Sequence, residues 1–219
     1  MKHYVFLYIQ KLTSLISCAI IQHIIKLCDA GSAIMAFFYF DFRDTNKKCR
    51  RDLLCSLIIQ FSSRSEPCLN ILSRLYSTYK VSNGQPSEYA LVQCLKDMLM
   101  TLSLCRLPIY IILDALDECP NTSGIPTQRG QVLGLVHDLI DLRLPNLRIC
   151  VTSRPEIDIR SSLSPMLSGH FSLHDQPGQQ ADIVEYIGAV VRSDTQMKRW
   201  REDDRNLVMD KLSDKADGM

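Results

Sequence analysis

The stretch IYIILDALDECP, from Ile109 to Pro120, decides how the rest of this chain is interpreted. Five apolar residues lead directly into Asp114, and Asp117 and Glu118 follow shortly after it. A continuous apolar run without alternation is typical of a parallel strand that is covered on both faces. The carboxyl ends of such strands form the edge at which α/β sheets bind ligands. The stretch therefore predicts a buried strand that presents acidic side chains at a binding edge.

The same kind of apolar run recurs along the chain, and helical patterns separate the runs. The predicted strands are Tyr4–Ile9, Ala33–Phe40, Ile109–Leu113, Leu147–Ser153 and a short edge strand at His170–Leu173. The predicted helices are Ser14–Ala30, Asn46–Phe61, Cys68–Lys80, Glu88–Leu102, Gln131–Leu142, Gln180–Arg192 and Glu202–Ala216, with a short one after Pro155. Strands that alternate with helices indicate an α/β fold with a parallel sheet and right-handed crossovers. We expect Asp114 and Arg154 to lie at the same edge of that sheet.

The composition excludes several classes of function. The 219 residues are 46% hydrophobic and 22% charged, which is ordinary for a globular protein. A net charge of +1 gives no bulk attraction to nucleic acid or to a membrane surface. The first apolar run, Tyr4–Ile9, is too short for a membrane span, although a signal or anchor is the alternative.

The cysteines predict an intracellular protein. There are nine, an odd number, and no pair forms a C-x-x-C motif. Most lie in apolar runs, so we interpret them as reduced core residues of a cytoplasmic protein, with a disulfide or zinc framework as the alternative. The five histidines show no metal-ligand spacing.

The acids after the Ile109 strand predict a metal and hydrolysis site. Asp114, at the strand tip, is placed to hold Mg²⁺ directly or through water. Asp117 or Glu118, on the following turn, could orient or deprotonate an attacking water. The alternative is that these acids cap the next segment and face solvent.

A second stretch, LRICVTSRPE from Leu147 to Glu156, predicts the cofactor-binding side of the site. If its strand neighbours the Asp114 strand, Arg154 lies beside the same metal. A guanidinium there could bind the terminal phosphate of a nucleotide and so respond to its hydrolysis. Ser153 and Arg154 are therefore the predicted cofactor-binding residues. The alternative is a surface arginine before a helix-starting proline.

The two stretches together resemble a known family. YIILDALDEC and, further on, ICVTSRPE are similar to the Walker B and sensor 1 motifs of NACHT-type signal-transduction NTPases, which belong to the STAND class. The nearer resemblance is to nephrocystin-3-like N-terminal domains, a subgroup expanded in fungi. FFYFDFRD (Phe37–Asp44) and SLHDQPGQQADIVEYI (Ser172–Ile187) are similar to the second strand and a later helical segment of that subgroup. The resemblance covers about Ile20 to Met219.

The resemblance implies a P-loop NTPase fold, Mg²⁺ with ATP or GTP, and a nucleotide-dependent oligomerisation switch. It gives Asp114 the role of the Mg²⁺-associated acid, Asp117 or Glu118 that of the hydrolytic acid, and Arg154 that of the sensor. The implied partners are other NACHT-type or repeat-containing protein chains, or further copies of this chain, rather than nucleic acid or membrane.

The phosphate loop that should accompany these motifs is missing from the sequence. It needs G-x-x-x-x-G-K-[ST], yet only Gly31 and Gly84 precede Asp114, and no lysine is followed by Ser or Thr. Matching SCAIIQHI to the first helix of the family puts Thr13 at the lysine position and Ser14 at the hydroxyl position. Lys11 is near but out of register. We therefore expect the phosphate loop to be lost near residues 10–14, and little or no nucleotide hydrolysis.

The sequence thus predicts a NACHT-like nucleotide-binding α/β core over residues 1–175 and the truncated start of a helical subdomain over 176–219, as in a fragment or a variant gene product. The first functional hypothesis is a signalling NTPase domain that keeps Walker B and sensor 1 and has lost Walker A. The second is a non-catalytic module that docks on related NACHT proteins. The third is a metal phosphoesterase that uses Asp114, Asp117 and Glu118 without a phosphate loop.

Overall fold

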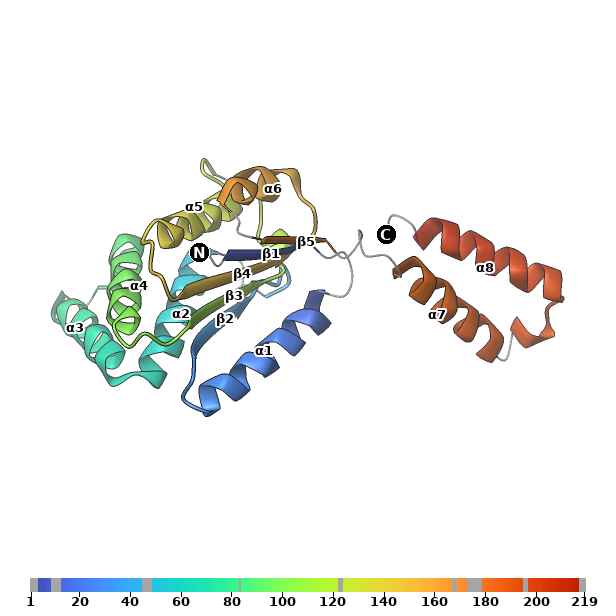
Figure 1. The fold of residues 1–219 in the computed structure, drawn as a ribbon. Coiled ribbons are helices and arrows are strands. Elements are labelled where there is room, and N and C mark those ends of the chain that lie inside the picture. Colours follow the sequence, from blue (N-terminus) through green and yellow to red (C-terminus); the bar gives the residue numbers. More distant parts are fainter. Residues whose placement is uncertain are drawn as a thin grey trace. The chain divides into compact units, whose positions relative to one another are not determined.

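The computed structural model describes residues 4–8, 13–44, 49–82, 84–121, 124–166, 169–172, 179–194 and 197–216. The chain divides into two compact units, Met1–Phe171 and Ser172–Met219. The first unit contains the sheet and the helices that cover it, and the second contains two helices joined by a short segment (Figure 1). No helix in these described ranges has both the length and the apolar character needed to cross a bilayer.

The strands of the first unit form one sheet. In the described part of the chain its order is β2-β3-β4-β1-β5. The strands are β1 (Tyr4–Tyr8), β2 (Ile34–Tyr39), β3 (Ile109–Asp114), β4 (Leu147–Ser153) and β5 (Gly169–Ser172). The pairs β2/β3, β3/β4 and β1/β4 are parallel. This arrangement confirms the predicted α/β fold, with strand ends that differ from the prediction by about one residue.

Helices cover both faces of this sheet. In the first unit they are α1 (Thr13–Asp29), α2 (Arg50–Arg64), α3 (Glu66–Ser82), α4 (Glu88–Ser103), α5 (Gln128–Ile140) and α6 (Ile157–Leu163), and short 3₁₀ turns lie at Leu116–Glu118 and Ser164–Met166. The second unit contains α7 (Gln179–Ser193), a 3₁₀ turn at Met197–Arg199 and α8 (Glu202–Ala216). Figure 1 shows α1 on one face of the sheet and α5 and α6 on the other.

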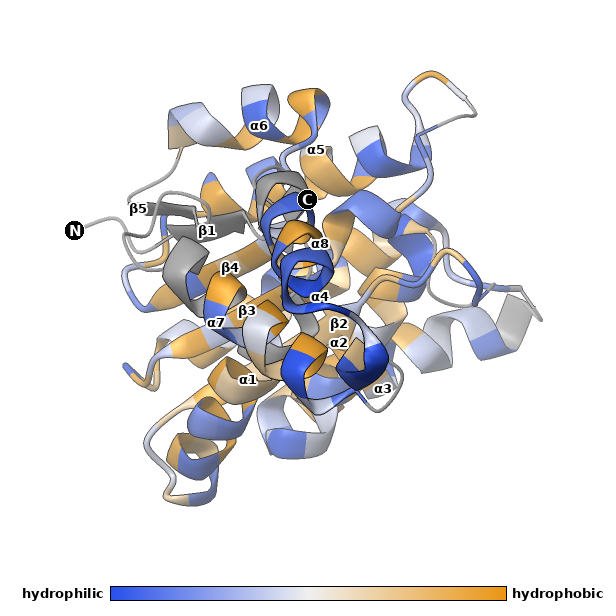
Figure 2. Ribbon diagram, turned by 90° about the vertical axis from the view of Figure 1, so that its right-hand side faces the viewer, coloured by the Kyte–Doolittle hydropathy of each residue, from blue (hydrophilic) through white to orange (hydrophobic). Residues whose placement is uncertain are grey.

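The two faces of the sheet bury very different amounts of apolar surface. The larger cluster joins β2, β3 and β4 to α2, α4 and α5, and the predicted stripe of α2 lies within it: Leu53, Leu54, Leu57, Ile58 and Phe61. The smaller cluster joins Ile21 and Ile24 of α1 to Met35 and Ile112 of the sheet. Adjacent strand residues point to opposite faces, so Ile111 belongs to the larger cluster and Ile112 to the smaller. In Figure 2, hydrophobic and hydrophilic residues alternate along α1 and α5, as expected for helices with one buried side.

A glutamine of α2 covers the outer edge of the sheet. β2 lies at one end of the described strand order, so one side of its backbone faces away from β3. The Gln60 side chain donates to the carbonyl oxygen of Phe37 at 2.7 Å and accepts from the Phe37 N–H at 3.0 Å. Gln60 therefore pairs with this edge much as a neighbouring strand would, which protects an otherwise open strand edge.

Two helices, α3 and α5, begin at least two residues earlier than the sequence predicted. α5 begins at Gln128 rather than Gln131, because the Thr127 hydroxyl caps it by accepting from the Gly130 N–H at 3.1 Å. α3 begins at Glu66 rather than Cys68, because Pro67 is tolerated in the first turn of a helix.

The prediction that the cysteines are core residues holds only in part. Cys68, Cys94 and Cys119 are buried, whereas Cys18 and Cys105 are exposed. No disulfide joins any of the nine cysteines, all of which lie in the described ranges.

Candidate functional site

Asp114 lies where three elements of the first unit meet. It ends β3 and is only 3% exposed. Its Oδ1 accepts hydrogen bonds from the Thr152 hydroxyl of β4, at 2.5 Å, and from the Ser17 hydroxyl of α1. Both hydroxyl residues are fully buried. Because a buried carboxyl group is tolerated only with hydrogen-bond partners, these two donors explain how the acid is held inside the fold.

Ala115 turns the chain sharply after Asp114. Its backbone angles, φ 55° and ψ 47°, lie in the left-handed region that non-glycine residues seldom adopt. Its N–H donates to the Thr152 hydroxyl at 3.1 Å, so the turn is tied to β4. The following 3₁₀ turn, Leu116–Glu118, is thereby directed toward the end of β4.

Asp117 and Arg154 form an ion pair across this edge. The Asp117 Oδ1 accepts from the backbone N–H of Arg154 at 3.0 Å, and its Oδ2 lies 3.2 Å from the Arg154 Nε. The Asp117 side chain is 8% exposed and that of Arg154 is 61% exposed. The structure thus brings Asp114, Asp117 and Arg154 to the same edge, as the sequence predicted.

The other two predicted site residues have contacts of a different kind. The Glu118 Oε2 accepts from the backbone N–H of Phe42, in the segment after β2, at 3.3 Å. Ser153 is fully buried, and its hydroxyl donates to the carbonyl oxygen of Arg154 at 2.7 Å. Glu118 therefore links the acidic turn to a second segment at the edge, whereas Ser153 supports the backbone at the end of β4.

A surface hollow of about 310 Å³ opens over the acidic turn. Its lining residues are Phe42, Asp117, Glu118, Cys119, Pro120, Arg129 and Arg154. Phe42 is 60% exposed and gives the hollow an aromatic wall beside the ion pair. Three of the predicted site residues therefore face one concave surface, which is the usual form of a ligand site.

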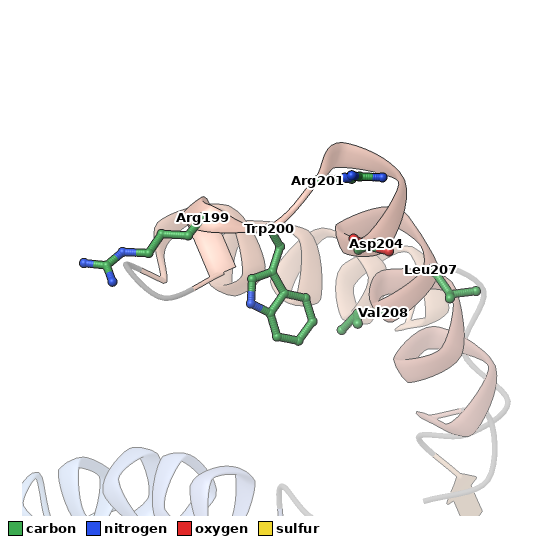
Figure 3. Close-up of a pocket in the computed structure, with 6 residues that line it drawn as sticks. All are labelled: Arg199, Trp200, Arg201, Asp204, Leu207 and Val208. Carbon is green, nitrogen blue, oxygen red and sulfur yellow. The ribbon is translucent and has the colours of Figure 1, made fainter.

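A second hollow, of about 490 Å³, lies in the second unit. It is lined by Arg199, Trp200, Arg201, Asp204, Leu207 and Val208. Figure 3 shows the Trp200 indole near Val208, with the Arg199 side chain extended away from the ring. None of the site residues predicted from the sequence lines this hollow.

Burial keeps two groups near Asp114 in their neutral form. Burial raises the pKa of Tyr39 to about 12, with further contributions from the Cys18 thiol and the charge of Asp114. Burial likewise raises the pKa of Cys150 to about 11, and Asp114 adds to the effect. Both groups remain protonated at neutral pH, so they add no negative charge beside the acid.

The residues around Asp114 suit a hard cation. Mg²⁺ prefers oxygen ligands, and here a carboxylate and two hydroxyl oxygens converge. No group of three or more His, Cys, Asp or Glu side chains gathers within the described ranges, so the metal would depend on water and on a bound phosphate for its other ligands.

The connection from β1 to α1 is shorter than a phosphate loop. β1 ends at Tyr8 and α1 begins at Thr13, so residues 9–12 alone join them, and they contain no glycine. A phosphate loop needs about six residues from its first to its second glycine, and its backbone N–H groups must curl around the anion. Lys11 lies outside the described residues, as do the side chains of Thr13 and Ser14.

The sequence motifs missed three residues that shape this site. Ser17 and Thr152 contact Asp114, and Arg129 donates to the Asp117 carbonyl oxygen at 2.6 Å. Ser17 is the small polar residue on the otherwise apolar buried side of α1, which was the available signal. Arg129 stands in a stretch that reads as a polar loop, and nothing in its spacing distinguishes it.

The match to a protein-family model agrees with the motifs. The family model described as Nephrocystin 3, N-terminal, matches residues 13–154, a range that includes Asp114, Asp117 and Arg154. A comparison with curated protein sequences gives no match. Among solved structures, the chain is similar to the Aeropyrum pernix ORC2 protein in its ADPNP-ADP complexes, with a TM-score of 0.45 and 8% identity. That similarity covers 85% of this chain and only 44% of the ORC2 chain. Because the family model matches well over half of the 219 residues, the chain belongs to the nephrocystin 3 N-terminal family, a NACHT-like group.

Proposed function

We propose that this chain is a signalling NTPase-type domain that retains the metal and sensor half of its nucleotide site and lacks the phosphate half. The observation that carries the proposal is the Asp114 carboxylate, bonded to Ser17 and Thr152 beside the Asp117–Arg154 pair. In the intact arrangement Asp114 would hold Mg²⁺, Asp117 or Glu118 would orient the attacking water, and Arg154 would sense the terminal phosphate.

In this chain these side chains already have hydrogen-bond or ion-pair partners within the protein. Two hydroxyl groups donate to Asp114, and Asp117 accepts from the Arg154 backbone N–H and forms an ion pair with the Arg154 guanidinium. A nucleotide would have to replace these contacts without a G-x-x-x-x-G-K-[ST] phosphate loop, which the sequence lacks. The chain would thus be a relative of a nucleotide-dependent oligomerisation switch in which the metal and sensor residues are already in place but nucleotide binds weakly.

The expected loss of affinity is large. A phosphate loop supplies several charge-assisted hydrogen bonds, each worth roughly 1.5–3 kcal/mol. Losing three of them removes at least about 4 kcal/mol, which is roughly a thousandfold in Kd. Mg²⁺ on Asp114 would not replace them, because the ion needs the phosphates among its own ligands.

Calorimetric titration of the purified chain with Mg·ATP and Mg·GTP tests this proposal. We expect no binding tighter than a Kd of about 1 mM and no rise in melting temperature with nucleotide. A chimera with a family-type strand and phosphate loop placed before Ser17 should bind more tightly, and Asp114→Ala should abolish that gain. Micromolar binding by the unaltered chain, lost in Asp114→Ala, would refute the proposal.

Apolar side chains exposed in the second unit favour a second candidate function, a module that docks on related NACHT-type chains. Leu207 is 59% exposed and Trp200 49%, and both line the hollow of the second unit, while Tyr186 is 71% exposed. Exposed apolar patches mark interaction surfaces. Light scattering of the chain alone, and of mixtures with a NACHT-type relative, tests this function. Tyr186→Ser together with Leu207→Ser should abolish any complex, and a complex that survives both changes would contradict this surface.

A further inference from the structure

A buried arginine holds the acidic turn from its inner side. The Arg129 Nη2 donates to the carbonyl oxygen of Asp117 at 2.6 Å, and its Nε donates to the carbonyl oxygen of Cys119 at 3.0 Å. One acceptor lies within the 3₁₀ turn Leu116–Glu118 and the other directly follows it. Arg129 therefore fixes the backbone that carries the acid, and it does so without touching the carboxylate.

The third nitrogen of the same guanidinium reaches α6. The Arg129 Nη1 lies 3.2 Å from Oδ1 and 3.3 Å from Oδ2 of Asp158. Asp158 is in the first turn of α6, which begins three residues after Arg154. Arg129 thus joins the segment after β3 to the segment after β4, and these two segments supply the two members of the Asp117–Arg154 pair.

Burial makes these contacts specific to arginine. The Arg129 side chain is 9% exposed, and a buried charge is tolerated only when it is paired and its donors are used. A planar guanidinium directs donors toward several acceptors at once, whereas the ammonium of lysine is a compact charge. Arg129→Lys therefore keeps the positive charge and removes the simultaneous contact with Asp117, Cys119 and Asp158.

We propose that Arg129 is a positioning residue for the Asp117–Arg154 pair, an inference that rests on the function proposed for this site. Arg129 donates to the backbone carbonyl of Asp117, while Arg154 contacts the Asp117 carboxylate. When the Arg129 contacts are lost, the turn moves, the Arg154 backbone N–H loses its acceptor and the ion pair with Asp117 opens. A residue that only stabilised the packing of α5 would lower stability and leave the pair intact.

Nitrogen-15 NMR of the full chain, labelled at arginine and free of nucleotide, separates these two roles. A backbone N–H that donates to a largely buried carboxylate exchanges slowly with water, so the Arg154 N–H should give a protected signal that disappears in Arg154→Lys and loses protection in Asp117→Asn. In Arg129→Lys, at a temperature where the fold is intact by circular dichroism, we expect the Arg154 signal to lose its protection as in Asp117→Asn. An unchanged Arg154 signal in folded Arg129→Lys would overturn the proposal.

Two further variants keep the test decisive. Arg148→Lys, at the opposite end of β4, should leave the Arg154 signal unchanged. A loss of Arg154 protection in Arg148→Lys would refute the specific role of Arg129. If Arg129→Lys does not fold, Asp158→Asn removes the charge that anchors Arg129 to α6, and we expect a less protected Arg154 signal. Full protection in Asp158→Asn would contradict the proposal. Because no nucleotide is present, the result is independent of the affinity measured by titration.

Discussion

The Ser17 hydroxyl on α1 donates a hydrogen bond to the Asp114 carboxylate at the end of β3, across 97 positions of sequence. With Thr152 as the second donor, this contact joins the first helix to two central strands through protein atoms alone. Matching the sequence to the first helix of the family had put Ser14, about one helical turn earlier, at the hydroxyl position of the phosphate loop. The contact with Asp114 that the structure describes is made by Ser17.

Removing this hydroxyl should destabilise the first unit. In Ser17→Ala the buried Asp114 loses one of its two donors, and a hydrogen bond to a charged group is worth about 1.5–3 kcal/mol. We expect the free energy of unfolding, measured in urea, to fall by that amount. Ser77→Ala, which removes an exposed hydroxyl bonded within α3, should change it by less than about 0.5 kcal/mol. Equal effects of the two substitutions would contradict a special role for Ser17.

The two members of the Asp117–Arg154 pair should differ in their contribution to stability. Arg154 is largely exposed, so Arg154→Ala should cost no more than about 1 kcal/mol, and less at high salt. The Asp117 side chain is 8% exposed and accepts from the Arg154 backbone N–H as well as pairing with its guanidinium, so Asp117→Ala should cost about 1.5–3 kcal/mol. Urea unfolding at low and high salt compares them, and a larger cost for Arg154→Ala would show that the pair is arranged differently.

Gln60 should protect the open edge of β2. In Gln60→Ala the N–H and carbonyl of Phe37 lose their partners, which should cost about 1–3 kcal/mol and leave a strand edge free to pair between molecules. We expect a lower urea midpoint and more self-association in sedimentation experiments. Gln93→Ala is a matched control, because Gln93 is exposed on α4 and bonds only to Asp97 among the contacts described. Equal self-association in both variants would argue against edge protection.

Buried thiols should make the fold sensitive to alkali. Burial raises the pKa of Cys94 to about 11 and that of Cys119 to about 12, from an ordinary value of 9.0. A group whose pKa is higher in the folded state contributes stability that is complete below its unfolded pKa and is lost as pH rises through its folded pKa. We therefore expect the free energy of unfolding to fall between pH 9 and 11, by up to about 1.4 kcal/mol per pH unit for each such thiol.

A pair of variants separates titration from packing in that experiment. Cys94→Ala removes one titrating thiol from α4 and should make the pH dependence less steep. Leu91→Ala removes a buried side chain from the same helix and should lower stability at every pH without changing the slope. A slope that is the same in Cys94→Ala and in the unaltered chain would contradict the assignment.

The strands of this fold were predictable because few structures other than a central parallel strand accommodate a short, continuous apolar run. Ile109–Leu113 and Leu147–Ser153 are covered on both faces, and such a run is hard to accommodate outside a central parallel strand. The common edge of Asp114 and Arg154 followed from that assignment, because the carboxyl ends of neighbouring parallel strands coincide.

The contacts within the site were less predictable because they depend on long-range geometry. Ser17 reads as a small residue in an apolar helix, and its role exists only because α1 crosses the end of β3. Arg129 was assigned to the polar loop before the helix predicted from Gln131, but the Thr127 cap starts α5 at Gln128 and so places Arg129 within the helix. Burial and the directions of donors decide such contacts, and local pattern carries little information about either.

The short connection between β1 and α1 bears on whether nucleotide binding could be regained by mutation. With Thr13 at the lysine position, substitutions alone would place the first glycine of a phosphate loop at position 7, where Leu7 of β1 pairs with Thr152 of β4. Such a glycine would shorten the strand that supports the loop. Keeping β1 whole would require an insertion of about two residues before the helix. Point mutations alone would therefore not install a phosphate loop of the G-x-x-x-x-G-K-[ST] form without a cost to β1.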